Sequence, residues 1–150
     1  MDRYDVIGRN AVAPAIPSTI ALVVAGATKR LFVRRITAGS ESAGTATSAG
    51  LSLGRPTTSG TGGASYTPVA QDPAAPAAIF TALSATTVWS AEPTQPTNYD
   101  QRIGLNVFTT YLEVFEQPYV VAVSARFAVR VEADVSGTKV QWTVTLGIEE

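Results

Sequence analysis

Two runs near the C-terminus place an apolar residue at every second position. The apolar positions of the first run are Phe127, Val129, Val131, Ala133 and Val135, and those of the second are Val140, Trp142, Val144, Leu146 and Ile148. A period of two is the spacing at which side chains reach the same face of a β-strand. The pattern predicts two strands that each bury one face, and it places Trp142 in the core.

The two runs are joined by a short loop that suits a tight turn. Ser136 and Gly137 are residues typical of two-residue hairpin loops. A turn there gathers the apolar residues of both strands on one face, whereas a shift of one residue would divide them. The sequence therefore predicts a β-hairpin with three opposed pairs: Val131 with Trp142, Val129 with Val144, and Phe127 with Leu146.

The middle of the chain carries very little charge. From Ile36 to Asn98 the charged residues are Glu41, Arg55, Asp72 and Glu92, and Ala, Thr, Ser, Gly and Pro dominate. Long amphipathic helices need straight-chain polar residues on their wet face and tolerate Gly and Pro poorly. The composition, together with the β-branched residues elsewhere, predicts an all-β protein.

Further strands are expected upstream of the two alternating runs. They cover residues 31–37, 49–53, 105–116 and 119–124, with Leu51 and Leu53 facing inward, while residues 79–89 fit one or two helical turns as well as a strand. About seven or eight strands separated by turns describe a β-sandwich or a jelly roll.

The N-terminal region contains an apolar run, Ile20–Ala27, behind an uncharged segment that Pro14 and Pro17 interrupt. The run is shorter than the roughly 20 residues that a helix needs to cross a bilayer. We expect a buried strand rather than a signal peptide, and no transmembrane segment. The predicted organisation is an irregular N-terminal arm over residues 1–19 and a single β-sandwich domain over residues 20–150.

An extended Gly/Pro-rich loop is predicted over residues 55–78. It contains four prolines and three glycines and shows no period. Connections in compact domains usually run about 4–6 residues, so a stretch this long is either disordered or lies along a partner. Its low charge argues against disorder of the kind in which a highly charged segment stays extended in solvent because its charges repel one another.

Histidine and cysteine are both absent, which excludes several kinds of site. The chain cannot form a Ser-His-Asp or Cys-His pair, a thiol redox site, or a zinc site with imidazole or thiolate ligands. Its net charge is −1, so no positive field attracts nucleic acid or an anionic membrane. We expect no enzymatic activity, no catalytic residues, no cofactor and no metal. An enzyme that uses two carboxylates alone is the alternative, but Glu113 and Glu116 would point to opposite faces of a strand.

One basic cluster surrounds the expected strand 31–37: Lys29, Arg30, Arg34 and Arg35. Alternation would place Lys29 and Arg35 on one face and Arg30 and Arg34 on the other, so the cluster is predicted to be split. One interpretation is that these charges prevent edge pairing, and another is that they contact an acidic protein surface. The candidate partner-contact residues, from this cluster and the extended loop, are Arg34, Arg35, Arg55, Tyr66 and Asp72.

Two aromatic residues suggest a different kind of site. Trp89 and Tyr99 flank a proline-rich segment, residues 92–97. An aromatic ring exposed there would offer a face on which a sugar stacks.

Six segments, taken in chain order, carry a resemblance to a class of known proteins. They are Lys29–Ile36, the small-residue strand that ends at Leu53, Gly60–Gly63, Thr67–Val69, Asp72–Ala78 and the closing β-hairpin that ends in Trp142–Glu150. Together they resemble small structural proteins of tailed bacteriophage particles.

The resemblance implies a virion component, and most directly a capsid decoration or cement protein that binds and stabilises the assembled phage head. Its implied partners are the major capsid protein and neighbouring copies of itself, in a homo-oligomer that is a dimer or a trimer. It would be made in the host cytoplasm and located on the capsid surface. The alternative is another virion component, such as a head-tail connector, a tail protein or a receptor-binding module with a carbohydrate site near Trp89 and Tyr99.

Overall fold

The structure is a computed structural model that describes residues 1–10, 17–41, 48–98, 100–106, 108–134 and 141–150. These residues form strands and no helix, so none of them belongs to a helix with the length and hydropathy of a membrane span. The strands are β1 (Arg3–Arg9), β2 (Ser18–Val24), β3 (Leu31–Ser40), β4 (Ser48–Gly54), β5 (Ala64–Tyr66), β6 (Val69–Ala70), β7 (Thr81–Ser84), β8 (Gln101–Asn106), β9 (Tyr111–Val121), β10 (Arg126–Asp134) and β11 (Trp142–Glu149). The predicted all-β class is confirmed.

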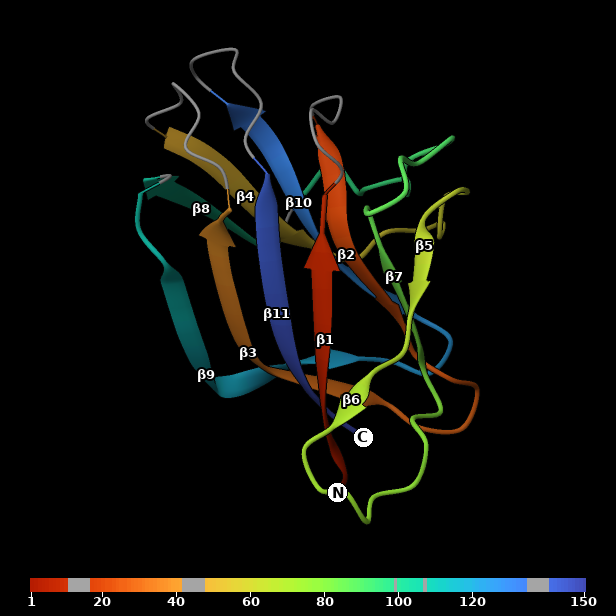
Figure 1. Cartoon of the computed structure of the whole chain (residues 1–150). Coiled ribbons are helices and arrows are strands. Elements are labelled where there is room, and N and C mark those ends of the chain that lie inside the picture. The colour runs from red at the N-terminus through yellow and green to blue at the C-terminus, as the bar shows by residue number, and fades with distance from the viewer. Residues whose placement is uncertain (11–16, 42–47, 99, 107, 135–140) are drawn as a thin grey trace.

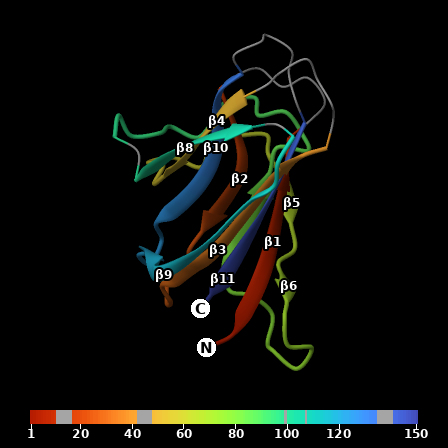
Figure 2. The ribbon, with the colours of Figure 1, turned by 90° about the vertical axis from the view of Figure 1, so that its left-hand side faces the viewer.

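The strands build two antiparallel sheets that pack face to face as a β-sandwich (Figures 1 and 2). Sheet A has the strand order β6-β1-β11-β3-β9, and sheet B has the order β5-β7-β2-β10-β4-β8. Most connections between long strands pass from one sheet to the other. Neighbours within a sheet are therefore far apart in the sequence.

Four strand pairs are nested along the chain. β1 pairs with β11, β2 with β10, β3 with β9, and β4 with β8, and every pair is antiparallel. The chain thus folds back on itself as one long hairpin, and the strands of this hairpin are divided between the two sheets. In the sequence, β5, β6 and β7 lie between β4 and β8. The two chain ends meet, since the N–H groups of Asp2 and Glu150 each donate to the other residue's carbonyl oxygen (3.2 and 3.1 Å).

One hydrophobic core lies between the sheets. Its largest members come from the inward faces of both sheets: Tyr4, Val6, Leu31, Ile36, Trp142, Leu146 and Ile148 from sheet A, and Ile20, Leu51, Leu53 and Phe127 from sheet B. The predicted inward faces of the two C-terminal strands and of β4 are confirmed for the described side chains. Burial of these side chains supplies the main driving force for folding.

The predicted hairpin between the two C-terminal strands is wrong. β10 pairs with β2 and β4 in sheet B, whereas β11 pairs with β1 and β3 in sheet A. The alternating pattern is satisfied all the same, because the inward faces of both sheets meet in the same core. The turn expected at residues 136–137 lies outside the described residues.

Two other expectations about strands are corrected. The strand expected over residues 105–116 is divided between β8, which ends in sheet B at Asn106, and β9, which begins in sheet A at Tyr111. β9 continues to Val121 and so includes the first part of the strand expected over residues 119–124. Residues 79–89 contain strand β7 and no helical turn.

The irregular arm predicted for residues 1–19 is replaced by a strand over much of its described part. Arg3–Arg9 forms β1, which lies between β6 and β11 in sheet A and sends Tyr4 and Val6 into the core. The buried strand expected to follow is confirmed as β2, although it begins at Ser18. Residues 11–16 lie outside the described residues.

Residues 55–78, which we call the strap, lie along their own domain. Within the strap, β5 pairs with β7 at the edge of sheet B, and β6 pairs with β1 at the edge of sheet A (Figure 1). Tyr66 of β5 also packs against the core. The strap therefore covers one edge of each sheet, and part of its low charge is explained by contacts within the domain.

Part of the outer face of sheet B, over β2 and β10, is packed against the chain's own Ala85 and Trp89, whereas the outward side of β8 is exposed at Arg102, Gly104 and Asn106. Trp89 is only 7% exposed and joins Leu22 in a second hydrophobic cluster. Its indole Nε1 donates to the carbonyl oxygen of Thr19 (2.7 Å), and the N–H of Thr19 donates to the carboxylate of Glu92 (2.9 Å). The part of this outer face over β2 and β10 thus has a cover that belongs to the same chain.

Candidate functional site

Within the part of the chain that the structure describes, the outer face of sheet A is open. Five large apolar side chains on it are between 39% and 67% exposed: Ile7, Val69, Leu112, Val114 and Val120. In the middle of this face, Thr145 of β11 and Thr37 of β3 lie side by side between Ile7 and Leu112. Apolar side chains therefore surround a centre of small polar residues.

A β-bulge in β3 places two arginines on this face. Gly147 and Ile148 are consecutive in β11, but they lie opposite Arg35 and Val33, so Arg34 is an extra residue in the ladder. Such a residue breaks strict alternation. Arg34 and Arg35 consequently both point outward, between the fully buried Val33 and Ile36. The prediction that these two arginines lie on opposite faces is wrong.

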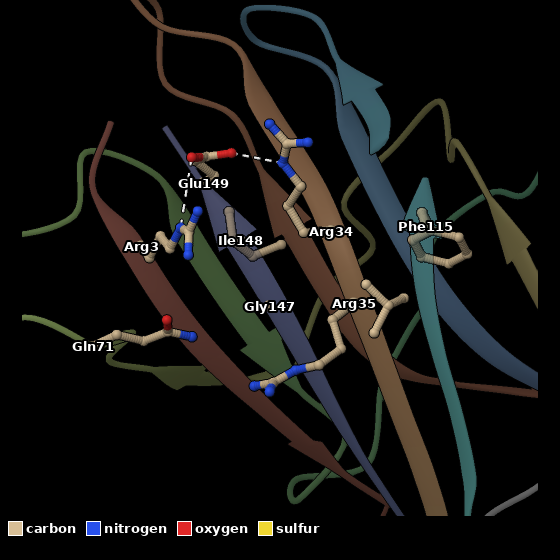
Figure 3. Close-up of a pocket in the computed structure, with 9 residues that line it drawn as sticks. Arg3, Arg34, Arg35, Gln71, Phe115, Gly147, Ile148 and Glu149 are labelled. Carbon is tan, nitrogen blue, oxygen red and sulfur yellow. Dashed lines mark hydrogen bonds and ion pairs between the residues drawn. The ribbon is translucent and has the colours of Figure 1, made fainter. Parts of the chain in front are cut away.

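The two arginines line a groove with a volume of about 460 Å³ (Figure 3). Its other lining residues come from four different segments: Arg3 from β1, Gln71 from the strap directly after β6, Val114 and Phe115 from β9, and Gly147, Ile148 and Glu149 from β11. The groove therefore crosses sheet A, with basic groups at one side and the apolar edge strand at the other.

A buried carboxylate lies between two of the arginines. Glu149 Oε2 is 2.6 Å from Arg34 Nε, and Glu149 Oε1 is 3.7 Å from Arg3 Nε. The Glu149 side chain is only 6% exposed. Since β11 runs between β1 and β3, the two arginines reach Glu149 from opposite sides (Figure 3).

Arg35 extends across β11 toward β1 (Figure 3). It can do so because Gly147 has no side chain, and a Cβ built there would lie 3.2 Å from Arg35 Cβ. At the far end, a terminal nitrogen of Arg35 donates to Asp5 Oδ1 (2.9 Å), which also accepts from the side-chain amide of Gln71 (3.0 Å). Arg35 Nε is buried and has no hydrogen-bond partner among the described residues.

Basic groups outnumber acidic groups around the groove. Three guanidinium groups face two carboxylates, Asp5 and Glu149, and both carboxylates are engaged by arginines. Within the described residues, no group of three or more His, Cys, Asp or Glu side chains is arranged to hold a metal ion.

The five candidate partner-contact residues do not gather in one place. Arg34 and Arg35 line the groove, whereas Arg55 pairs with Asp100 (2.9 Å between Nε and Oδ2) and Tyr66 packs against the core. The carboxylate of Asp72 accepts the N–H of Ala74 (2.9 Å) and so caps a turn of the strap. The groove residues that the sequence did not single out are Arg3, Gln71, Val114, Phe115, Gly147, Ile148 and Glu149.

A second polar cluster joins the free edges of the two sheets. Tyr111 donates to the carboxylate of Glu113, which also accepts from Gln101 Nε2 (3.2 Å), and Tyr119 donates to Gln101 Oε1 (2.9 Å). Burial raises the pKa of Tyr111 above its ordinary value, and the contact with Glu113 raises it further. Burial also raises the pKa of Tyr119. Both phenols thus remain protonated donors, and the cluster connects β8 to β9.

The sugar-stacking site suggested for Trp89 is not supported by its position. The ring packs against the outer face of sheet B, and its Nε1 is already hydrogen-bonded to Thr19. A buried ring has no face to offer a sugar. Tyr99, the other member of that pair, lies outside the described residues.

The fold and the groove define a two-sheet β-sandwich in which the outer face of sheet B is partly covered by the chain itself and the outer face of sheet A carries paired arginines. No protein-family model, curated protein or solved structure matches the chain. The functional argument therefore depends on the geometry of the two faces.

Proposed function

We propose that the chain is a non-enzymatic structural protein that docks on a larger assembly through the outer face of sheet A. The observation that carries this proposal is the contrast between the two outer faces. Ala85 and Trp89 cover the apolar residues on the outer side of β2 and β10 in sheet B, whereas sheet A exposes five large apolar side chains around an arginine-lined groove. Exposed apolar surface bordered by polar residues is typical of a protein interaction site.

The assembly that we propose is the head of a tailed bacteriophage, with this chain as a capsid decoration protein. The four nested strand pairs support a jelly roll, an architecture found in viral capsid and lectin domains. Because a fold alone does not determine function, the step to a phage head rests on the resemblance carried by the segments between Lys29 and Glu150. A place in the connector or the tail is the alternative within the same particle.

The proposed partners are the major capsid protein and neighbouring copies of the chain, as a dimer or a trimer on the capsid surface. A rigid sandwich with one open face can bind each shell subunit modestly, and many copies in a symmetric lattice then act together. Strand β9 brings Leu112 and Val114 to the open face. It is also an edge strand of sheet A, and its neighbour in that sheet is β3.

Sedimentation with particles tests this function. Particles released from cells that express the chain would be purified on a density gradient and probed with an antibody raised against the purified protein. We expect the protein to band with DNA-filled heads and to remain with heads from which the tails have been removed. Protein that stays at the top of the gradient would reject a virion role, and protein that follows the detached tails would reject the decoration role.

A further inference from the structure

The arginines of the groove retain hydrogen-bonding capacity beyond their partners within the chain. Arg3, Arg34 and Arg35 have side chains that are between 39% and 67% exposed. Arg3 and Arg34 approach Glu149 through Nε rather than through their terminal nitrogens. The end of a guanidinium group is a fork that fits both oxygens of a carboxylate.

The charge of the groove also favours an additional anion. Its three guanidinium groups exceed its two carboxylates by one positive charge. The buried Nε of Arg35 lies over Gly147 and has no partner in the described part of the chain. An incoming carboxylate at the exposed ends of the arginines would balance the charge.

The surroundings of the groove indicate what carries that anion. Val114 forms one wall and is 67% exposed, and Leu112 and Ile7 lie one row away on the same face. No lysine lines the groove. A polyanion such as nucleic acid is bound by a broad basic surface, whereas a mixed apolar and basic surface complements a peptide that alternates acidic and apolar side chains.

We propose that the groove binds a carboxylate side chain from an acidic, partly apolar segment of a partner protein. This inference rests on the proposed function in that it names the chemistry by which the outer face of sheet A recognises its partner. The carboxylate lies at the ends of Arg3 and Arg34, and the neighbouring apolar side chains pack on Val114 and Leu112.

A peptide titration tests the inference on the intact chain. The probe is the capped pentapeptide Val-Glu-Val-Glu-Val, its control is the same peptide with glutamine in place of glutamate, and binding is followed by NMR at the arginine Nε–H signals. We expect saturable shifts at Arg34 and Arg35 with the acidic peptide, and binding at least about tenfold weaker with the glutamine peptide, which corresponds to about 1.4 kcal/mol. Equal binding of the two peptides would overturn the proposal.

Matched variants locate the site. Arg3→Gln and Arg35→Gln should each weaken binding of the acidic peptide, whereas Arg55→Gln should leave it unchanged, because Arg55 is similarly exposed but pairs with Asp100 away from the groove. Arg34 is left intact in these variants, because its loss would leave the buried Glu149 without its nearest cation. Unchanged binding in both groove variants would overturn the proposal.

Inorganic phosphate separates a specific carboxylate site from a general anion site. Saturable shifts with phosphate as strong as those with the peptide would overturn the proposal. Protein that bands with phage heads but ignores the acidic peptide would contradict this inference alone. Protein that binds the peptide but never bands with particles would contradict the proposed function alone.

Discussion

Replacing Trp142 with alanine is expected to lower the free energy of unfolding by about 3–5 kcal/mol, the usual cost of removing a large aromatic side chain from a core. The indole is 1% exposed and lies among the inward-facing residues of both sheets. The backbone of Trp142 is held by Asn10, whose Oδ1 accepts the Trp142 N–H (2.5 Å). The alanine variant keeps this backbone hydrogen bond, so the loss of unfolding free energy measures the loss of side-chain packing.

Urea unfolding followed by circular dichroism measures this loss. Domains are commonly stable by about 5–15 kcal/mol, so the alanine variant should be close to half-unfolded in mild denaturant. Trp142→Phe keeps most of the apolar volume and should cost less than half as much. An alanine variant within about 1 kcal/mol of the native protein would show that Trp142 is not packed between the sheets.

Replacing Trp89 with alanine is expected to have a comparable effect, of about 3–4 kcal/mol, although this residue lies outside the main core. Its ring supplies the largest side chain of the second cluster, and its Nε1 satisfies the carbonyl oxygen of Thr19. The variant removes both contributions. It should also expose the outer face of sheet B, so a dye that binds apolar surface should gain fluorescence.

Trp89→Phe separates the two contributions to this effect. The phenylalanine variant loses the hydrogen bond to Thr19 but keeps a ring against Leu22, so it should lose about 1–3 kcal/mol, the cost of leaving a buried acceptor unpaired. If Trp89 were an exposed sugar platform instead, alanine would change stability by less than about 0.5 kcal/mol.

The sequence identified inward faces better than it identified strand neighbours. Alternation in residues 127–131 and 142–148 predicts which side chains are buried, and the apolar side chains at every second position are buried in the structure. It does not specify which strand lies alongside. In a sandwich, either arrangement buries the same faces, so the hairpin between β10 and β11 and their actual separation into two sheets fit the same pattern.

The N-terminal strand could have been found by the same reasoning. Tyr4, Val6 and Gly8 alternate with charged or exposed residues in Arg3–Arg9, and the three of them are buried. Pro14 and Pro17, which follow this strand, instead indicate an irregular arm. With β1 assigned to an arm, Arg3 had no place on a sheet, and a groove that it lines could not be anticipated.

The groove itself depends on a feature that no short-range pattern reveals. Strict alternation separates Arg34 from Arg35, and the bulge that brings them together arises from the pairing of β3 with β11. Glu149 and Gly147 fall on the outer face by simple alternation. That these two lie between Arg34 and Arg3 follows only from the strand order of sheet A.

The central claim is that the open face of sheet A, and not the covered face of sheet B, is the docking surface. The chain contains no cysteine, so a single introduced thiol is a unique reporter. Val114→Cys places it on the open face, and Val88→Cys places it on the segment that covers sheet B, at positions that are 67% and 61% exposed. Both thiols should react with a maleimide at similar rates in the free protein.

The decisive measurement is the same labelling carried out on protein bound to purified heads. We expect the thiol at position 114 to react at least about tenfold more slowly on the particle, because an interface excludes the reagent until the complex opens. The thiol at position 88 should react as it does in the free protein. Unchanged labelling at position 114, or protection confined to position 88, would contradict the account.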